Sequence, residues 1–221
     1  MDFQKYLDSK NYQNGQMSNF VGLWSVSGSF GTIDGKADYT VTTNKNVTTY
    51  EYVAENVKLK SEFTKERNGV VVRKDYFTNL CDKPITINKF FNRFRMQGDD
   101  YEVYTQYSAW LHESVGGWQK LINQIACASL GIRTCDGATP MMALKNRYNN
   151  KTVVFHLMPN CQWKMAVKKT PITDRDVVYL ETGIEDSDLR LEVNAGEVIE
   201  LPTVIFFEVE NTVDFDGYKL H

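Results

Sequence analysis

The sequence lacks the short motifs that mark many catalytic and cofactor sites. It contains no G-x-G-x-x-G or G-x-x-x-x-G-K-[ST] loop to hold phosphates, no H-E-x-x-H zinc helix and no G-x-S-x-G nucleophile turn. Histidine, a common general base and metal ligand, occurs only three times. We therefore predict no metal site and no cofactor. The 28 acidic residues leave a catalytic carboxylate pair open, because sequence alone does not give the separation of two side chains.

Long apolar runs and an excess of basic residues are absent too. No segment approaches the roughly 18 apolar residues that cross a bilayer. The polar residues that follow Met1 do not form the apolar stretch of a signal peptide. The net charge of −3 argues against a nucleic-acid partner. The four cysteines form no C-x-x-C pair, which favours free thiols. Together these absences predict a cytoplasmic protein without a membrane or nucleic-acid partner.

The sequence does contain many short runs of β-prone residues. Residues 50–63 alternate apolar and charged side chains, which indicates a strand with one buried face. The Asn68-Gly69 pair marks a turn before the next run. Similar runs lie at residues 70–72, 85–91, 101–107, 152–158, 163–168, 177–181, 189–193 and 198–209. This spacing predicts a single domain over residues 1–221, an all-β antiparallel sandwich of about ten or more strands with few short helices.

Two regions depart from this strand pattern. Residues 3–12 are compatible with a short helix. In residues 118–130 the apolar side chains recur near the helical period, so a helix and a buried strand both remain open there. Turn-forming clusters separate the expected strands, and we interpret the Gly116-Gly117 pair as one of these turns.

One stretch, residues 101–118, combines aromatic side chains with amides and carboxylates. Aromatic rings pack on the apolar faces of sugars, while amides and carboxylates hydrogen-bond to hydroxyl groups, which is the chemistry of a sugar site. The same residue types are also common in a core or at a domain interface. The candidate residues for carbohydrate contact or a domain interface are Tyr104, Gln106, Tyr107, Trp110, Glu113 and Trp118.

These residues carry a resemblance to a known family. Residues 92–94, 100–110 and 117–121, together with Glu113, resemble the N-terminal β domain of family 36 glycoside hydrolases, the α-galactosidases or melibiases. The likeness continues at residues 129–140, 154–163, 183–188, 195–197 and 201–202. It covers roughly residues 50–221, whereas residues 1–45 form a divergent N-terminal segment. Residues 211–221 resemble the start of a connector to a catalytic (β/α)8 barrel.

The resemblance implies a large supersandwich, similar to the galactose-mutarotase fold. In the family, the barrel carries a carboxylate nucleophile in a Lys-Trp-Asp-x-Asn motif and a second carboxylate, and it hydrolyses terminal α-galactosides with retention. This chain has no such motif, and a barrel needs about 250 residues. We therefore expect no catalytic residue here and a chain that is inactive alone. The implied partners are the absent barrel, further copies in a homo-oligomer and, for the full-length bacterial enzyme, a galacto-oligosaccharide.

Two other functions stay open. A stand-alone carbohydrate-binding module of this fold would need an exposed aromatic platform, for which Trp110 and Trp118 are the candidates. A mutarotase-like sugar epimerase, the less favoured alternative, would need a glutamate base and a histidine acid within reach of one substrate atom. The candidates for that pair are His112 and His156 with Glu102 or Glu113.

Overall fold

Strands with one apolar face dominate the fold, as the alternating residues predict. The computed structural model describes residues 2–7, 22–34, 39–109, 112–129, 137–172 and 175–209. In β5 (Val57–Lys65), every second side chain from Val57 to Phe63 is buried. The turn after β5 contains Gly69 with a φ of +84°, a conformation that glycine adopts at no steric cost. The predicted Asn68-Gly69 turn is confirmed, because β5 pairs antiparallel with β6 (Val71–Asn79).

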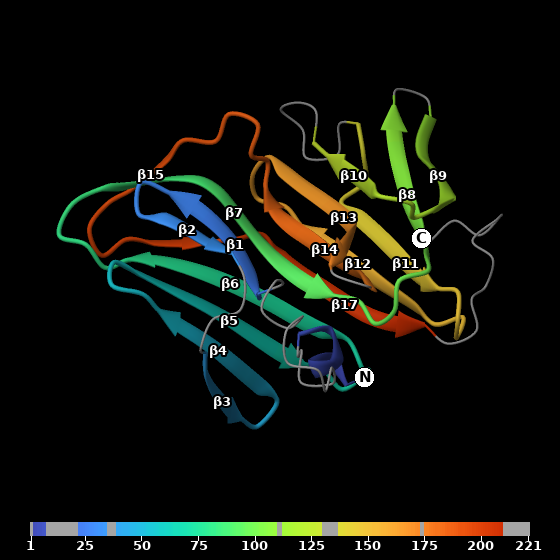
Figure 1. The fold of residues 1–221 in the computed structure, drawn as a ribbon, viewed down its shortest axis with the longest axis horizontal. Helices are drawn as coiled ribbons and strands as arrows, with labels where there is room; N and C mark the ends of the chain where they lie inside the picture. The colour runs from blue at the N-terminus through green and yellow to red at the C-terminus, as the bar shows by residue number, and fades with distance from the viewer. Residues whose placement is uncertain are drawn as a thin grey trace.

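Two antiparallel sheets form the sandwich (Figure 1). The smaller sheet has seven strands, and β15 pairs with β7 beside the main path. In spatial order its strands are β10 (Gln124–Ala128), β13 (Trp163–Ile172), β14 (Arg175–Ile184), β7 (Ile85–Arg95), β1 (Trp24–Gly28) and β2 (Gly31–Asp34), with β15 (Leu191–Val193).

The larger sheet has ten strands, and β16 pairs with β6 beside its main path. In spatial order its strands are β3 (Thr40–Asn44), β4 (Val47–Val53), β5, β6, β17 (Thr203–Val209), β12 (Thr152–Met158), β11 (Met141–Asn146), β8 (Tyr101–Ala109) and β9 (His112–Lys120), with β16 (Val198–Glu200). The expected all-β antiparallel sandwich is therefore confirmed. The expected single strand over residues 198–209 is interrupted at Pro202, which has no N–H for a ladder hydrogen bond.

The main hydrophobic core lies between the two sheets and encloses one ion pair. Arg73 and Asp75, both on β6, are fully buried, and Arg73 Nε lies 2.8 Å from Asp75 Oδ2. The other sheet supplies further partners: Trp24 Nε1 donates to Asp75 Oδ1 at 2.9 Å, and Asn92 Nδ2 donates to Asp75 Oδ2 at 3.0 Å. Arg73 also donates to the carbonyl oxygen of Leu23 at 2.9 Å. This buried network ties the two sheets together at one point.

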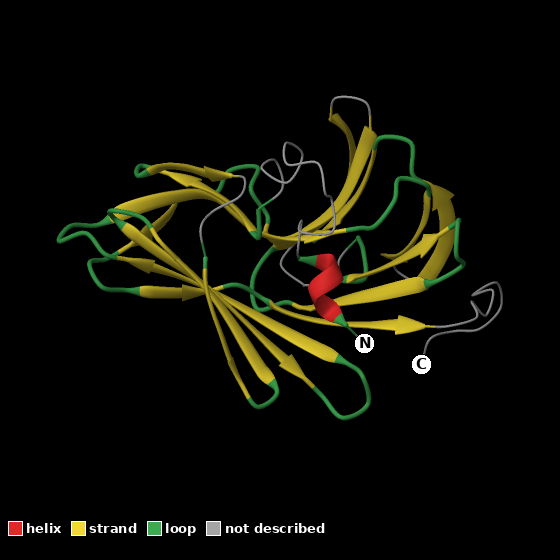
Figure 2. Cartoon of the chain, turned by 60° about the horizontal axis from the view of Figure 1, so that its bottom comes forward, coloured by secondary structure: helices red, strands yellow, loops and turns green. Residues whose placement is uncertain are grey.

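The helical content of the described chain is a single turn, η1 (Phe3–Tyr6), near the N-terminus (Figure 2). Asp2 caps this turn by accepting a hydrogen bond from the N–H of Gln4 at 3.1 Å. Phe3 stacks on Phe63 of the ten-stranded sheet with ring centroids 5.0 Å apart, so η1 packs on the inner face of that sheet. The expected helix over residues 3–12 is thus confirmed only in its first turn, and residues 8–12 lie outside the described residues.

The helix considered for residues 118–130 is wrong. Trp118 belongs to β9, and β10 follows after a short connection. In β10 the side chains alternate: Cys127 joins the main core, and Ile125 packs against it. Ile122 is 81% exposed, so the apolar residues of this stretch do not share one helical face. None of the described helices could cross a membrane, since η1 has only four residues.

Candidate functional site

A second, smaller apolar cluster lies on the face of the ten-stranded sheet that points away from the main core. We call it the outer patch. Its buried members come from β8, β11 and β12, and its partly buried members come from β9 and β17. It consists of Tyr104, Met141, Ala143 and Val154, with Trp118, Phe207 and Val209 packed against them.

Strand register places the centre of the outer patch on one continuous row across five strands. Cross-strand pairing joins Trp118 to Tyr104, Tyr104 to Ala143, Ala143 to Val154 and Val154 to Phe207. Five strands contribute one residue each, although the residues span positions 104 to 207 of the chain. With about 4.8 Å between strands, the row is roughly 19 Å long. It is therefore long enough to meet a flat partner surface or several sugar rings.

Tyr104 anchors the aromatic end of the outer patch. Its ring centroid lies 5.4 Å from that of Trp118, and Gln106 Nε2 donates a hydrogen bond to its hydroxyl at 3.3 Å. The phenol ring lies above Gly116, where a Cβ atom would be 2.5 Å from Tyr104 Cζ. The prediction of a turn at Gly116-Gly117 is therefore wrong: both residues are inside β9, and Gly116 leaves room for the tyrosine.

Charged side chains flank the patch on one side. Lys145 Nζ lies 5.8 Å from the Trp118 ring centroid, and it lies 3.9 Å from Glu102 Oε2. Arg147 Nη1 lies 3.5 Å from Asp100 Oδ2. These groups are partly exposed, so each ion pair contributes little to stability. The patch thus has an apolar centre and a charged rim, an arrangement typical of contact surfaces.

The opposite side of the patch is less charged. His156 and Met158 both lie on the same face as Val154, as alternation in the sequence predicts. Partial burial lowers the pKa of His156, which favours its neutral form at pH 7. Glu102 also points outward, but register sets it two strands and four residues away from His156, about 16 Å. That distance is too long for the acid–base pair that a mutarotase-like reaction needs.

The structure unites three of the six predicted site residues. Tyr104, Gln106 and Trp118 meet on the outer face. Tyr107 points to the other face and is 47% exposed, opposite Val115 on β9. Trp110 lies outside the described residues. Glu113 belongs to β9, but its side chain is outside the description, as is that of His112.

Sequence reasoning missed the part of the patch that comes from β11, β12 and β17. The missed residues are Met141, Ala143, Val154, Phe207 and Val209. A signal for them exists, because these strands contain apolar runs in which alternation gives way to consecutive apolar residues. Such runs indicate strands that are buried on both faces.

A chain of ion pairs occupies the outward face of the seven-stranded sheet. Arg93 contacts Asp34 and lies 2.7 Å from Glu181 Oε1, and Lys168 Nζ lies 2.6 Å from Glu181 Oε2. Burial alone would raise the pKa of Glu181, but the two basic neighbours outweigh it and hold that pKa below its usual value. The charges compensate one another, so this cluster is a structural network rather than a reactive carboxylate.

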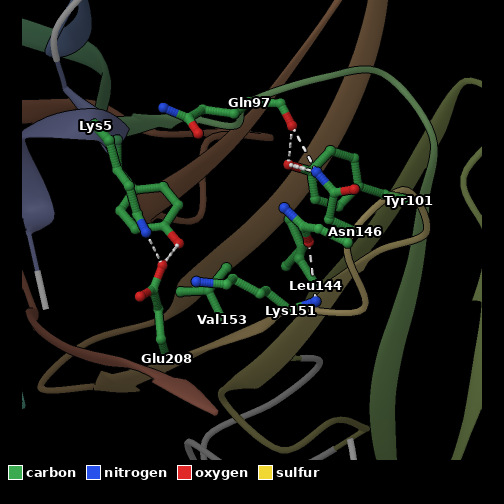
Figure 3. Close-up of a pocket in the computed structure, with 10 residues that line it drawn as sticks. Lys5, Gln97, Tyr101, Leu144, Asn146, Lys151, Val153 and Glu208 are labelled. Carbon is green, nitrogen blue, oxygen red and sulfur yellow. Dashed lines mark hydrogen bonds and ion pairs between the residues drawn. The ribbon is translucent and has the colours of Figure 1, made fainter. Parts of the chain in front are cut away.

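A small polar cavity of about 30 Å³ lies between η1 and the strands under it (Figure 3). Lys5 points to Glu208 in Figure 3 and forms an ion pair with it. The Tyr6 hydroxyl also donates to Glu208 Oε1, at 2.6 Å. Across the cavity, Asn146 Nδ2 donates to the carbonyl oxygen of Gln97 at 2.9 Å. A cavity of this size holds about one water molecule and no sugar. Its contacts hold η1 in place.

No protein-family model matches the sequence, and no curated protein matches it either. Solved structures do match. The galactosidase domain of the α-galactosidase–sucrose kinase AgaSK aligns with a TM-score of 0.71 and 15% identity, over 84% of this chain and 29% of that one. The α-galactosidase from Lactobacillus brevis aligns with a TM-score of 0.69 and 14% identity, over 92% of this chain and 30% of that one. The family 36 α-galactosidase AgaB from Geobacillus stearothermophilus aligns with a TM-score of 0.68 and 15% identity, over 92% of this chain and 31% of that one.

The chain shares the fold of one part of these α-galactosidases. It spans about 30% of their length. At identities near 15%, the similarity establishes the fold alone. A TPR-domain-containing protein from Parabacteroides distasonis also aligns, with a TM-score of 0.52 and 9% identity over 85% of this chain. Because one fold can serve several functions, the role of this chain has to be argued from its surfaces.

Proposed function

We propose that this chain is the N-terminal, non-catalytic β-sandwich domain of an α-galactosidase-like glycoside hydrolase. One observation carries the proposal: solved α-galactosidases match 84–93% of this chain but only 29–32% of their own chains. The catalytic carboxylates then belong to a (β/α)8 barrel outside this sandwich. The full-length enzyme hydrolyses terminal α-galactosides with retention, and this domain supports the barrel, subunit assembly and the entrance to the sugar site.

Three acidic residues that are buried or partly buried, Asp75, Glu181 and Glu208, fit a scaffold role. A retaining glycosidase needs two carboxyl groups about 5–5.5 Å apart around the scissile bond. Asp75 and Glu181 are buried and each is bound to an arginine. Glu208 lines the water-sized cavity and is bound by Lys5 and Tyr6. None of these three carboxylates is in a position to attack a sugar.

The outer patch is the surface that we assign to contact with the barrel or with sugar at its entrance. It places Trp118 and Tyr104 side by side, next to Gln106, at one end of the five-strand row. The ion pairs along one side supply part of the polar rim that contact surfaces between domains have.

The test is isothermal titration calorimetry with galactose, melibiose and raffinose, beside hydrolysis of a chromogenic α-galactoside. We expect the chain alone to show neither binding nor turnover. The chain followed by its barrel should hydrolyse the α-galactoside. Turnover by the chain alone would refute the proposal, because the sandwich would then carry its own catalytic carboxylates.

A stand-alone carbohydrate-binding module is the second candidate. The observation that favours it is the grouping of Tyr104, Gln106 and Trp118 on one face. Binding without turnover in the calorimetry would support this candidate. Trp118→Ala should then abolish sugar binding, whereas Tyr107→Ala, which removes an aromatic ring from the opposite face, should leave it unchanged.

The cytoplasmic location of the protein stays a prediction.

A further inference from the structure

The strand β3 forms one edge of the ten-stranded sheet (Figure 1). Among the described strands it pairs only with β4. All five of its residues, Thr40 to Asn44, are exposed, and Val41 is 50% exposed. One side of the β3 backbone therefore carries N–H and C=O groups that face solvent without a partner strand in the described chain.

This edge lacks the devices by which proteins usually prevent edge-to-edge pairing. Such devices are charged side chains, proline, bulges and very short strands. The residues of β3 are Thr-Val-Thr-Thr-Asn, with no charge, no proline and no glycine, and four of the five are β-branched. By contrast, the opposite edge strand β9 carries Glu113, Lys120 and two glycines. The edge strand β2 has only four residues and includes Asp34.

The hairpin geometry determines which backbone groups point outward. A two-residue connection, Lys45 and Asn46, joins β3 to β4, and Asn44 pairs with Val47. The pair that closes such a hairpin exchanges both of its hydrogen bonds, and bonded and non-bonded pairs alternate from there. Thr42 therefore bonds toward β4, while the N–H and C=O groups of Val41 and Thr43 point away from the sheet.

We propose that β3 pairs antiparallel with β3 of a second copy of this chain across a two-fold axis at Thr42. In that register Val41 faces Thr43 of the partner copy, and the two outward-pointing residues of each strand form the hydrogen-bonded pairs. Thr42 faces its own equivalent, and Thr40 faces Asn44. No like charges meet, and the strand is complementary to itself over its full length. The result is one continuous sheet that runs through both copies.

This inference refines the assembly part of the proposed function. Its test measures mass and not sugar binding or hydrolysis, so the two can fail separately. A five-residue strand pair buries less surface than the roughly 1,200–2,000 Å² of a standard stable interface. We therefore expect association to be weak and visible only at high protein concentration.

The test is sedimentation equilibrium of the 221-residue chain over a wide concentration range at 0.15 M salt. The wild-type mass should rise from 25.4 kDa toward twice that value. Thr42→Lys and Thr42→Glu each place like charges directly opposite one another, and each should weaken association by up to about fivefold. An equimolar mixture of the two variants should associate again, because the introduced lysine of one copy would then face the introduced glutamate of the other.

Thr49→Lys and Thr49→Glu are the matched controls. Thr49 lies on β4, directly across from Thr42, and is therefore one strand away from the sheet edge. Its substitution should leave the association unchanged, since charges more than a Debye length apart are largely screened. The proposal is overturned if the wild type stays monomeric at the highest concentration, or if the Thr42 variants associate as the wild type does. It is also overturned if mixing those variants does not restore association.

Discussion

Gly116 gives the sharpest test of how the outer patch is built. A Cβ atom at this position would lie 2.5 Å from Tyr104 Cζ and 2.8 Å from the carbonyl oxygen of Thr105. The carbonyl belongs to the neighbouring strand and does not move easily. Gly116→Ala therefore has to displace the Tyr104 ring, which is 7% exposed and packs against Trp118.

The expected size of the effect follows from two opposing terms. Overpacking of this kind costs about 1–3 kcal/mol. Replacing glycine by alanine in a strand stabilises the folded state by about 0.5–1 kcal/mol, because the unfolded chain loses conformational freedom. We therefore expect Gly116→Ala to lower the free energy of unfolding by about 0–2.5 kcal/mol. Gly117→Ala is the matched control: its Cβ would meet nothing within 4 Å, so it should be neutral or slightly stabilising.

The assay is urea unfolding followed by tryptophan fluorescence, with the free energy taken from the linear extrapolation. Adding Tyr104→Leu, which removes Cζ and the hydroxyl but leaves the Thr105 carbonyl in place, should cancel part of the cost of Gly116→Ala in a double-mutant cycle. Equal stabilities for the Gly116→Ala and Gly117→Ala variants would refute this account of the patch. So would additive effects of Gly116→Ala and Tyr104→Leu.

Three further predictions concern buried groups. Asp75→Ala leaves Arg73 charged and without its carboxylate partner in the core and should cost about 3–5 kcal/mol in urea unfolding. The folded-state pKa of Glu181 lies below its unfolded value near 4.5, so its contribution to stability is present above that pH and is lost as pH falls. The stability difference between the wild type and Glu181→Gln should accordingly shrink between pH 7 and pH 3, and a constant difference would contradict it. Burial raises the pKa of Cys127 to about 12, so mass spectrometry after iodoacetamide treatment of the folded chain at pH 8 should find Cys127 unmodified and the less buried Cys81 modified.

Local patterns in the sequence predicted the strands well because a strand with one buried face has a period of two. In the run from Val57 to Phe63 and at the Asn68-Gly69 turn, the local sequence is enough to predict the structure. The local sequence was not enough at the Gly116-Gly117 pair, since glycine occurs both in turns and under a neighbouring side chain. What decides between the two is the ring of Tyr104, which belongs to another strand.

The outer patch could be predicted only in part for a related reason. Tyr104 and Trp118 are close in sequence and pair across one hairpin, so the aromatic stretch pointed to both. Val154 and Phe207 join the same row through the registers of β11, β12 and β17. Register is a property of the whole sheet, because a shift of one residue turns every side chain to the other face. No local pattern contains it.

The buried Arg73–Asp75 pair offers a physical reason why the two sheets meet in one alignment. Apolar side chains in a core tolerate many packings of similar energy. The carboxylate of Asp75, in contrast, accepts hydrogen bonds from Trp24 and Asn92 of the opposite sheet, in addition to those from Arg73 and Ser61 of its own sheet. A sliding of one sheet would leave a buried charge without these partners, which is far costlier than a loss of apolar contact. We infer that this pair fixes the alignment of the two sheets more than it adds to the net free energy of unfolding. Replacing Arg73 and Asp75 together by apolar residues should therefore cost less in the free energy of unfolding than Asp75→Ala alone, while broadening the amide resonances of the strands that meet there.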